Sequence, residues 1–179
     1  TFRSIIDAAR FVEWAVANLA IFRDLAATTT RHGKLVDMKS SLNSNTAFLI
    51  FEFKTGDAAG QNMVTVATEK ICEWITSNSP FRPEVWYVEG NLSGDKKATM
   101  LSFLSHRGRK VVAEAVVKRS DVKRFLHTTP EAMVEYCRIS TIGGIQSGSI
   151  GIQGHYANAL AALFLCCGQD VACLSEASV

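Results

Sequence analysis

The chain has 179 residues, 47% of them hydrophobic and 20% charged, with a formal net charge of +2 at pH 7. These values describe a globular chain with enough apolar residues for the core of one domain or of two small ones. The net charge is too small to indicate binding to nucleic acid or to a membrane surface, so we expect neither partner. The longest apolar run, residues 157–167, is too short to cross a bilayer, and we expect no membrane segment within these residues.

The five cysteines do not follow a disulfide or metal-binding pattern. Their number is odd, and Cys166 and Cys167 are adjacent within an apolar run, which favours packing in a reducing compartment over a disulfide framework. The histidines and cysteines also lack the spacing of a ligand set, so the sequence predicts no metal site.

The first part of the chain predicts a helix followed by two strands. Apolar residues recur at steps of four and three over residues 5–19, which is the stripe of an amphipathic helix. Residues 28–39 are rich in threonine and charge and indicate an exposed strand, whereas the apolar residues 46–53 indicate a more buried one. A turn rich in serine and asparagine at residues 40–45 separates these two strands.

A second helix and a third strand follow. We expect the helix over residues 60–76, before a Ser-Asn-Ser-Pro stop, and the strand over residues 85–88. The order α-β-β-α-β becomes βαββαβ if one further strand precedes Thr1. The sequence therefore predicts an α+β protein whose residues 1–87 form a ferredoxin-like, split βαβ domain.

The second half of the chain predicts a hairpin and then three helices. Residues 100–105 and 111–117 indicate the two strands of the hairpin. The expected helices cover residues 121–127, 130–137 and 156–167. The last of these is apolar nearly all round, so we expect it to be buried.

Residues 56–63, Gly-Asp-Ala-Ala-Gly-Gln-Asn-Met, form a glycine-flanked turn between a predicted strand and a predicted helix. Helix N-termini expose unpaired N–H groups and the positive end of the dipole, which suits a phosphate or the polar edge of a cofactor. The spacing is neither that of the dinucleotide-binding fingerprint nor that of a P-loop. On spacing alone, the turn favours an ordinary helix start with Asp57 as the N-cap.

A charged tripeptide, Asp95-Lys96-Lys97, lies on a loop bounded by glycines. Three adjacent charges on a loop are usually a solvated turn. The functional alternative is a lysine that stabilises the oxyanion developing on a thioester or aldehyde carbonyl. The tripeptide by itself leaves both interpretations open.

Asp170 is the first charged residue after a stretch without Asp, Glu, Lys or Arg that runs from Ile139 to Gln169. A carboxylate beside a buried helix is usually paired with a cation or takes part in acid–base chemistry, but it can also be a turn residue that faces water. His155 and Asn158 are three residues apart and share one helix face, which fits either a binding role or ordinary packing.

These segments follow one another in an order that resembles the catalytic core of class I 3-hydroxy-3-methylglutaryl-coenzyme A reductases. The matching segments are the turn at 56–63, Asp95-Lys96-Lys97, Gly148-Ser149-Ile150-Gly151, His155-Tyr156-Ala157-Asn158 and Gly168-Gln169-Asp170. The resemblance extends over essentially the whole chain, which makes it much more specific than any single motif.

The resemblance implies an NADPH-dependent reduction of hydroxymethylglutaryl-coenzyme A to mevalonate with release of coenzyme A. It gives Lys96 the position of the catalytic lysine and Asp170 that of the aspartate that holds it. It implies cofactor contacts for Thr30, Arg31, Asp57, Ala58, Ala59, Gly60, Gln61 and Asn62. It implies substrate contacts for Asp95, Lys97, His155 and Asn158.

The resemblance also implies an organisation. Residues 1–87 correspond to the small NADP-binding domain with its first strand largely missing, residues 88–99 to a connecting catalytic loop, and residues 100–179 to part of the larger α+β substrate-binding domain. The family's active site forms at a subunit interface, so we expect a cytoplasmic homodimer or larger oligomer. Its catalytic glutamate and histidine match no residue of the chain, so we expect a piece of a longer protein that is inactive and poorly soluble alone.

Some residues depart from the family pattern. Ala59 and Gln61 replace two methionines of the family's cofactor turn, and Glu89 stands where the animal enzymes have a serine. Two rival interpretations remain: an enzyme of the same fold that uses NADH or oxidises mevalonate, and a non-catalytic ferredoxin-like binding module.

Overall fold

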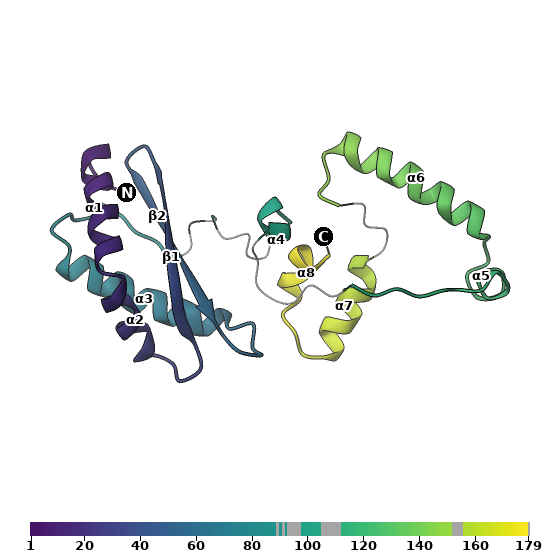
Figure 1. The fold of residues 1–179 in the computed structure, drawn as a ribbon, viewed down its shortest axis with the longest axis horizontal. Coiled ribbons are helices and arrows are strands. Elements are labelled where there is room, and N and C mark those ends of the chain that lie inside the picture. The colour runs from purple at the N-terminus through teal and green to yellow at the C-terminus, as the bar shows by residue number, and fades with distance from the viewer. Residues whose placement is uncertain (89, 91, 93–97, 105–111, 152–155, 179) are drawn as a thin grey trace. The chain divides into compact units, whose positions relative to one another are not determined.

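The structure is a computed structural model that describes residues 1–88, 90, 92, 98–104, 112–151 and 156–178. It divides into two compact units, residues 1–93 (unit 1) and residues 94–179 (unit 2), drawn in Figure 1. The chain contains helices and an antiparallel two-stranded sheet, so the expectation of an α+β protein is confirmed.

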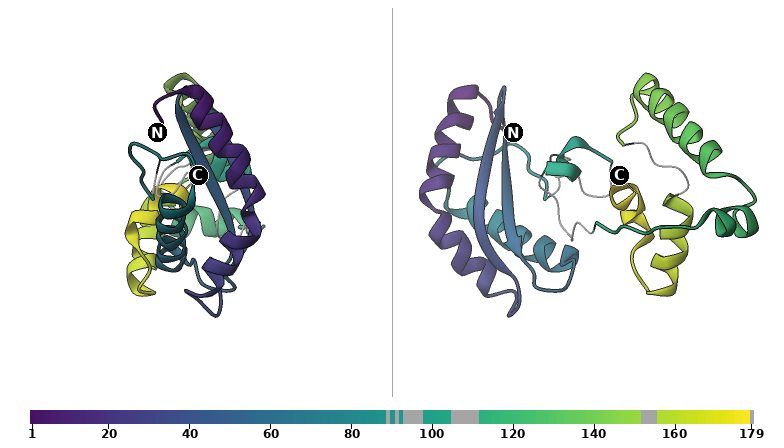
Figure 2. Two further views of the ribbon diagram at one scale, coloured as in Figure 1. Left: turned by 90° about the vertical axis from the view of Figure 1, so that its left-hand side faces the viewer. Right: turned by 45° about the vertical axis from the view of Figure 1, so that its right-hand side comes forward.

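The described residues of unit 1 form three helices and a β-hairpin. In chain order these are α1 (Ile5–Ala17), α2 (Leu19–Ala27), β1 (Lys34–Asn43), β2 (Thr46–Lys54) and α3 (Gln61–Asn78). Helices α1 and α2 follow one another along the hairpin, and α3 packs against α2 (Figures 1 and 2). The predictions of a strand at β2 and of a helix at α3 are confirmed, and the residues of β2 before Lys54 are half-buried.

A break at Asn18 separates α1 from α2, so the single helix expected over residues 5–19 is wrong in its extent. Ser4 caps the start of α1, where its hydroxyl accepts a hydrogen bond from the amide of Asp7 at 3.1 Å. At the other end, the Asn18 side chain donates to the carbonyl of Trp14 at 2.7 Å. This bond satisfies one of the last carbonyls of α1 and ends the helix. The stripe of apolar residues in the sequence does not indicate this helix end.

The hairpin is antiparallel and β1 covers Lys34–Asn43, so the strand expected over residues 28–39 is wrong at both ends. The turn expected at residues 40–45 is wrong over residues 40–43, which belong to β1. The hydroxyl groups of Thr28 and Thr29 donate to carbonyls of the last turn of α2, at 2.6 and 2.8 Å. Threonine favours strands, but its hydroxyl also bonds to nearby backbone, and here that bonding finishes a helix.

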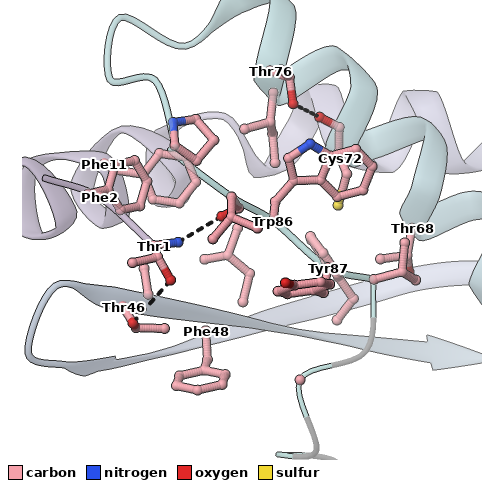
Figure 3. A pocket seen from close by; sticks show the side chains of 18 residues that line it. Thr1, Phe2, Phe11, Thr46, Phe48, Thr68, Cys72, Thr76, Trp86 and Tyr87 are labelled. Carbon is pink, nitrogen blue, oxygen red and sulfur yellow. Dashed lines mark hydrogen bonds between the residues drawn. The ribbon is translucent and has the colours of Figure 1, made fainter.

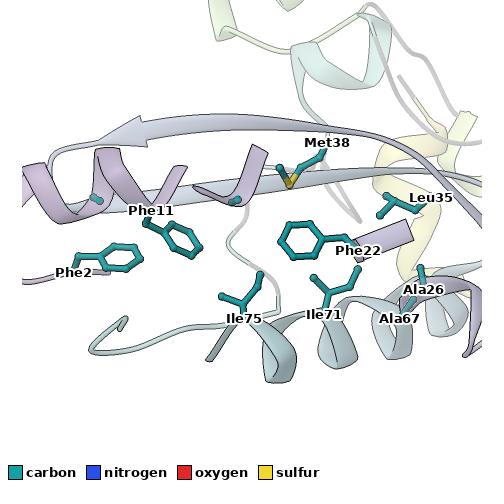
Figure 4. Close-up of a cluster of buried hydrophobic side chains, with 11 residues drawn as sticks. Phe2, Phe11, Phe22, Ala26, Leu35, Met38, Ala67, Ile71 and Ile75 are labelled. Carbon is teal, nitrogen blue, oxygen red and sulfur yellow. The ribbon is translucent and has the colours of Figure 1, made fainter. Parts of the chain in front are cut away.

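The core of unit 1 lies between the hairpin and the helices. In Figure 4, Leu35 and Met38 of the hairpin and Ile71 of α3 surround Phe22 of α2. Phe22 and Ile71 are fully buried, and the ring of Phe22 meets that of Trp74 edge-on at a centroid distance of 6.0 Å. Burial of a side chain of this size stabilises a fold by about 1.5–3 kcal/mol, so this cluster anchors α2 and α3 together.

Residues 85–88, expected as a third strand, form no strand, and the sheet in the described part of unit 1 contains β1 and β2 alone. The ferredoxin-like arrangement is therefore not confirmed. Thr1 is nevertheless bonded to this segment, since its nitrogen donates to the carbonyl of Val85 at 2.9 Å and its carbonyl accepts from the amide of Glu84 at 2.8 Å. The amide of Phe2 donates to the hairpin turn, at the carbonyl of Asn45.

The described residues of unit 2 are largely helical. The elements are α4 (Met100–Leu104), α5 (Arg119–Phe125), α6 (Pro130–Ser147), α7 (Tyr156–Cys166), the 3₁₀-helix η1 (Val171–Cys173) and α8 (Leu174–Ala177). The hairpin expected over residues 100–117 is wrong where the structure describes it, because α4 replaces its first strand and residues 112–118 have no regular structure. A short apolar run such as residues 100–104 fits either a strand or a helix, and periodicity cannot separate them.

Helix α6 begins as expected, with Thr129 as its N-cap and Pro130 in its first turn. The predicted end at residue 137 is wrong, because the helix continues to Ser147 and ends at Gly148, which has a φ of +71°. No described helix of the chain is long and apolar enough to span a membrane.

Helix α7 is apolar but not buried, which corrects the expectation of a buried helix. Its described residues include none that is buried, and Leu165 is 69% exposed. Within unit 2, α7 contacts η1 and α8. Among the described residues of this unit, Val122 and Glu176 alone are buried.

Candidate functional site

The expected cofactor turn joins β2 to α3 and depends on two glycines with positive φ. Gly56 has a φ of +68° and Gly60 a φ of +77°, a region that side chains rarely adopt. A Cβ on Gly60 would lie 2.5 Å from Cγ2 of Thr55, so the space also requires glycine. The Thr55 hydroxyl closes the turn by donating to the carbonyl of Ala58 at 2.6 Å.

The N-cap of α3 is Gly60, which corrects the interpretation of Asp57 as the cap. Because glycine has no side chain, it supplies no capping acceptor to the first turn of α3. Such a helix start offers amide donors and the positive end of the dipole to an anion. The residues before it are open to solvent, namely Asp57, Ala58 and Ala59, as is Asn62 in the first turn, whereas Gln61 is half-buried.

The structure brings the Thr30-Arg31 segment to this turn, although the two are far apart in the sequence. The hydroxyl of Thr30 donates to Sδ of Met63 at 2.8 Å, and Met63 belongs to the first turn of α3. Arg31 is exposed, and it makes no hydrogen bond or ion pair with the residues that the structure describes. The segment that carries Arg31 thus lies against the first turn of α3.

A second contact supports the same juxtaposition. The ammonium of Lys70, two turns along α3, donates to the hydroxyl of Thr28 at 2.8 Å. Between these two contacts, Ala26 and Ala67 are fully buried where α2 packs on α3. The small side chains let the helices approach closely, so the end of α2 and the segment after it are held against α3.

A cavity in the described part of unit 1 lies elsewhere, beside β2 (Figure 3). It has a volume of about 160 Å³ and is mostly apolar, with Phe48, Trp86 and Tyr87 among the side chains that line it. None of the expected cofactor residues lines it. Cys72 also lines it, and burial, with a smaller contribution from Glu69, raises the pKa of this thiol to about 11.

The expected catalytic residues are only partly described. Lys96, with Asp95 and Lys97, lies outside the described residues, as does His155. Asp170 is exposed and caps η1, where its carboxylate accepts a hydrogen bond from the amide of Ala172 at 2.9 Å. It therefore follows an exposed helix and not the buried one that the sequence predicts.

Asn158 lies in the first turn of α7 and is exposed. Its expected pairing with His155 on one helix face falls partly outside the described residues. The structure therefore places Asn158 at an accessible helix start and leaves its binding role a prediction. No group of three or more His, Cys, Asp or Glu residues in the described part of the chain could hold a metal ion.

Two residues that position the site could not be singled out from the sequence. Gly33 is buried, and a Cβ there would lie 2.9 Å from Sδ of Met63. Met63 was expected only as the last residue of the turn, but its side chain reaches the segment before β1. The sequence signal for these contacts is weak, because a glycine after an Arg-His pair also fits any loop.

The comparison with known proteins agrees with the resemblance found in the sequence. All of residues 1–179 match the family model described as hydroxymethylglutaryl-coenzyme A reductase. The chain belongs to this family. Similar curated proteins, each named 3-hydroxy-3-methylglutaryl-coenzyme A reductase, occur in Pyrococcus abyssi, Methanocaldococcus jannaschii and Ganoderma lucidum.

The relative from Pyrococcus abyssi is 44% identical over 171 residues, which is 93% of this chain and 41% of the relative. The relative from Methanocaldococcus jannaschii is 38% identical over 184 residues, which is 99% of this chain and 45% of the relative. That from Ganoderma lucidum is 38% identical over 99% of this chain, which covers 15% of its own length. The chain thus spans less than half the length of these relatives.

Proposed function

We propose that this chain supplies the NADPH-binding part and a portion of the substrate-binding part of a class I hydroxymethylglutaryl-coenzyme A reductase. The full enzyme reduces hydroxymethylglutaryl-coenzyme A to mevalonate and free coenzyme A in two hydride transfers. The observation that carries the proposal is the Thr30–Met63 contact, which brings the segment with Arg31 to the uncapped start of α3. The membership of the whole chain in the family supports the same reaction.

The residues of this site fit a phosphorylated dinucleotide. Arg31 offers a planar fork of donors to the 2′-phosphate of NADPH. Gly60 allows the backbone to approach the nucleotide closely, since a Cβ there is excluded by Thr55 and by the positive φ. The remaining contacts come from the exposed turn: Asp57, Ala58, Ala59, Gln61 and Asn62. When bound, NADPH supplies the hydride.

Lys96 polarises the reacting carbonyl. Its ammonium donates a hydrogen bond to the thioester oxygen and then to the aldehyde oxygen, where negative charge develops as hydride arrives. Asp170 keeps the ammonium charged and oriented, and Asp95 orders the lysine loop. Lys97, His155 and Asn158 bind the substrate and its coenzyme A part. Two molecules of NADPH and two protons are consumed for each mevalonate formed.

The proposal includes the assembly of the site. Lys96 of one subunit and Asp170 of another meet at the interface of a cytoplasmic homodimer or larger oligomer, and the chain alone lacks reductase activity. The exposed apolar residues of unit 2 support this, because an apolar helix such as α7 needs a covering surface. The assignment of residues 1–87 to the cofactor, 88–99 to the connecting loop and 100–179 to the substrate belongs to the same proposal.

A ferredoxin-like sheet remains part of the proposal. It requires an extended segment between β2 and residues 85–88, and the apolar cavity in Figure 3 lies between them. Thr1 stands at one end of that cavity, since it bonds to Val85 and its hydroxyl lies 3.3 Å from that of Thr46. A strand in this place would cover the free edge of β2 and exclude water from the cavity.

Titration of the full-length protein with NADPH and with NADH tests the function. We expect NADPH to bind at least about tenfold more tightly, because a charge-assisted phosphate contact contributes about 1.5–3 kcal/mol. Equal affinity for the two nucleotides would favour the NADH-linked enzyme of the same fold. Binding of neither would favour a non-catalytic module.

A further inference from the structure

We infer that Thr30 and Met63 are positioning residues that fix Arg31 at the start of α3 and thereby set the preference for a nucleotide with a 2′-phosphate. The inference rests on the proposed function and deepens it, because it assigns the specificity to a contact between two loops and not to Arg31 alone. It also changes the role expected for Thr30, from a cofactor contact to a residue that acts through its neighbour.

The hydroxyl of Thr30 is fully used within the protein. It donates to Sδ of Met63 at 2.8 Å and accepts hydrogen bonds from the amides of His32 at 3.1 Å and of Gly33 at 3.2 Å. A hydroxyl has one proton and two lone pairs, so these three contacts exhaust it. The two accepted bonds fold the backbone into a tight turn, and Arg31 lies inside that turn between its bonded ends.

The side chain of Met63 fills the space between two glycines on separate segments. A Cβ on Gly33 would lie 2.9 Å from its sulfur, and a Cβ on Gly60 would lie 3.1 Å from its terminal methyl. One side chain therefore contacts both the turn that carries Arg31 and the N-cap of α3. Methionine suits this role because its unbranched, polarizable chain fills irregular gaps.

One face of α3 carries all of these supports. Met63, Ala67 and Lys70 are spaced by four and three residues, so they lie on the same side of the helix. Met63 contacts Thr30, and Lys70 donates to Thr28 at 2.8 Å. The segment after α2 is thus attached to α3 at two points on either side of a buried alanine contact.

The consequence for binding is a smaller loss of conformational freedom. Arg31 projects from a backbone that is already fixed on both sides, so binding a phosphate orders the side chain but not the loop. Without the Thr30–Met63 contact, phosphate binding would have to order the loop as well as the side chain. The entropy lost in ordering the loop would then weaken the contact between Arg31 and the phosphate. NADH lacks that phosphate, so its affinity should change much less.

The test uses the full-length protein and compares conservative variants. Thr30→Val removes the hydroxyl at constant shape, Met63→Leu removes the sulfur acceptor, and Thr30→Ser restores the hydroxyl. Thr76→Val is the matched control, because its hydroxyl bonds a helix carbonyl at the far end of α3. We expect Thr30→Val and Met63→Leu to weaken NADPH binding by about three- to tenfold, the range of one net hydrogen bond, and NADH by less than about twofold. Thr30→Ser and Thr76→Val should bind both nucleotides as the unaltered protein does.

A second readout does not depend on the nucleotide. Thr30→Val should speed amide hydrogen exchange at His32 and Gly33 and shift the methyl resonance of Met63, whereas Thr76→Val should change neither. Unchanged exchange and resonance in Thr30→Val would overturn the inference.

The nucleotide titrations distinguish a failure of the proposed function from a failure of this inference. If the unaltered protein binds neither nucleotide, the proposed function falls and this inference falls with it. If the unaltered protein prefers NADPH but Thr30→Val and Met63→Leu keep that preference, or lose both nucleotides equally, the inference alone is overturned.

Discussion

Unit 1 and unit 2 are built from similarly apolar sequence but bury it very differently. In unit 1, Phe22 and Ile71 are fully buried between helices and hairpin. In unit 2, Val122 is the one buried apolar residue among those described, while Leu165 is 69% exposed. The apolar residues of unit 1 therefore stabilise the unit itself, whereas most of those described in unit 2 are left uncovered.

The difference follows from the contacts that each unit makes along the chain. The hairpin brings residues 34–54 back across α1 and α2, so distant segments share one core. In unit 2, the described contacts of α7 are with η1 and α8, which follow it directly in sequence. Short-range contacts of this kind cover little of a helix that is apolar on all sides.

The proposed cofactor residues and the proposed substrate residues fall in different units. The cofactor turn and Arg31 are held by the well-packed unit, which suits a site that must be preorganised. The proposed substrate residues belong to the unit whose surfaces are uncovered, which suits a site completed by another subunit. The predictions below test this division.

The largest effect is expected for Lys96→Met in the full-length protein. Loss of one oxyanion donor should lower kcat by roughly a hundred- to a thousandfold. Steady-state oxidation of NADPH in the presence of hydroxymethylglutaryl-coenzyme A measures it, with Lys123→Met on α5 as the control lysine. Activity within a factor of three of the unaltered enzyme would reject Lys96 as the catalytic lysine.

Ile71→Ala should destabilise unit 1 by about 2–5 kcal/mol, because it leaves a cavity in the core. Val66→Ala, on the exposed side of the same helix, should change the stability by less than about 0.5 kcal/mol. Urea unfolding followed by tryptophan fluorescence reports this unit, since Trp14, Trp74 and Trp86 all lie in it. Equal effects of the two substitutions would show that the core is not where the structure places it.

Leu165→Ser should leave the unfolding of the 179-residue chain unchanged to within about 0.5 kcal/mol, because the side chain is exposed. The chain should bind the dye ANS through unit 2, and the substitution should reduce that binding. In the full-length protein, the same change should weaken subunit assembly, measured by analytical ultracentrifugation. If ANS does not bind the unaltered chain, the contrast between the units is wrong.

A further prediction concerns the Cys72 thiol, whose pKa burial raises from 9.0 to about 11. The folded protein holds this proton where the unfolded chain releases it, so stability should fall as the pH rises from 9 to 11. Alkylation by iodoacetamide, followed by mass spectrometry, should be slower at Cys72 than at the exposed Cys137 and should keep rising with pH up to about 11. Rapid alkylation of Cys72 at pH 8 would contradict its burial.

Several features could be predicted from local sequence because their causes are local. The strand at residues 46–53, the helix after Gly60 and the start of α6 at Pro130 each depend on neighbouring residues that favour one structure. The segment at residues 28–33 could not be predicted in the same way, since threonine favours a strand and its hydroxyl also ends a helix. The segment at residues 100–104 is too short for its hydrophobic period to distinguish a strand from a helix.

The candidate site likewise has one feature that local sequence predicts and others that it does not. The glycine turn was visible because positive φ and close approach leave glycine as the choice at Gly60. The Thr30–Met63 contact joins residues that are 33 positions apart, so it depends on how α2 packs against α3. Similarly, the exposure of α7 is set by what surrounds it, and its own composition predicts burial.

The central claim is that Arg31, held at the start of α3, recognises the 2′-phosphate of NADPH. Arg31→Ala in the full-length protein tests it most directly, with Arg10→Ala, an exposed arginine of α1, as the matched control. We expect the dissociation constant of NADPH to rise at least about tenfold, the loss of one charge-assisted contact, while that of NADH stays within about twofold. Equal changes for NADPH and NADH, or no change for either, would contradict the account.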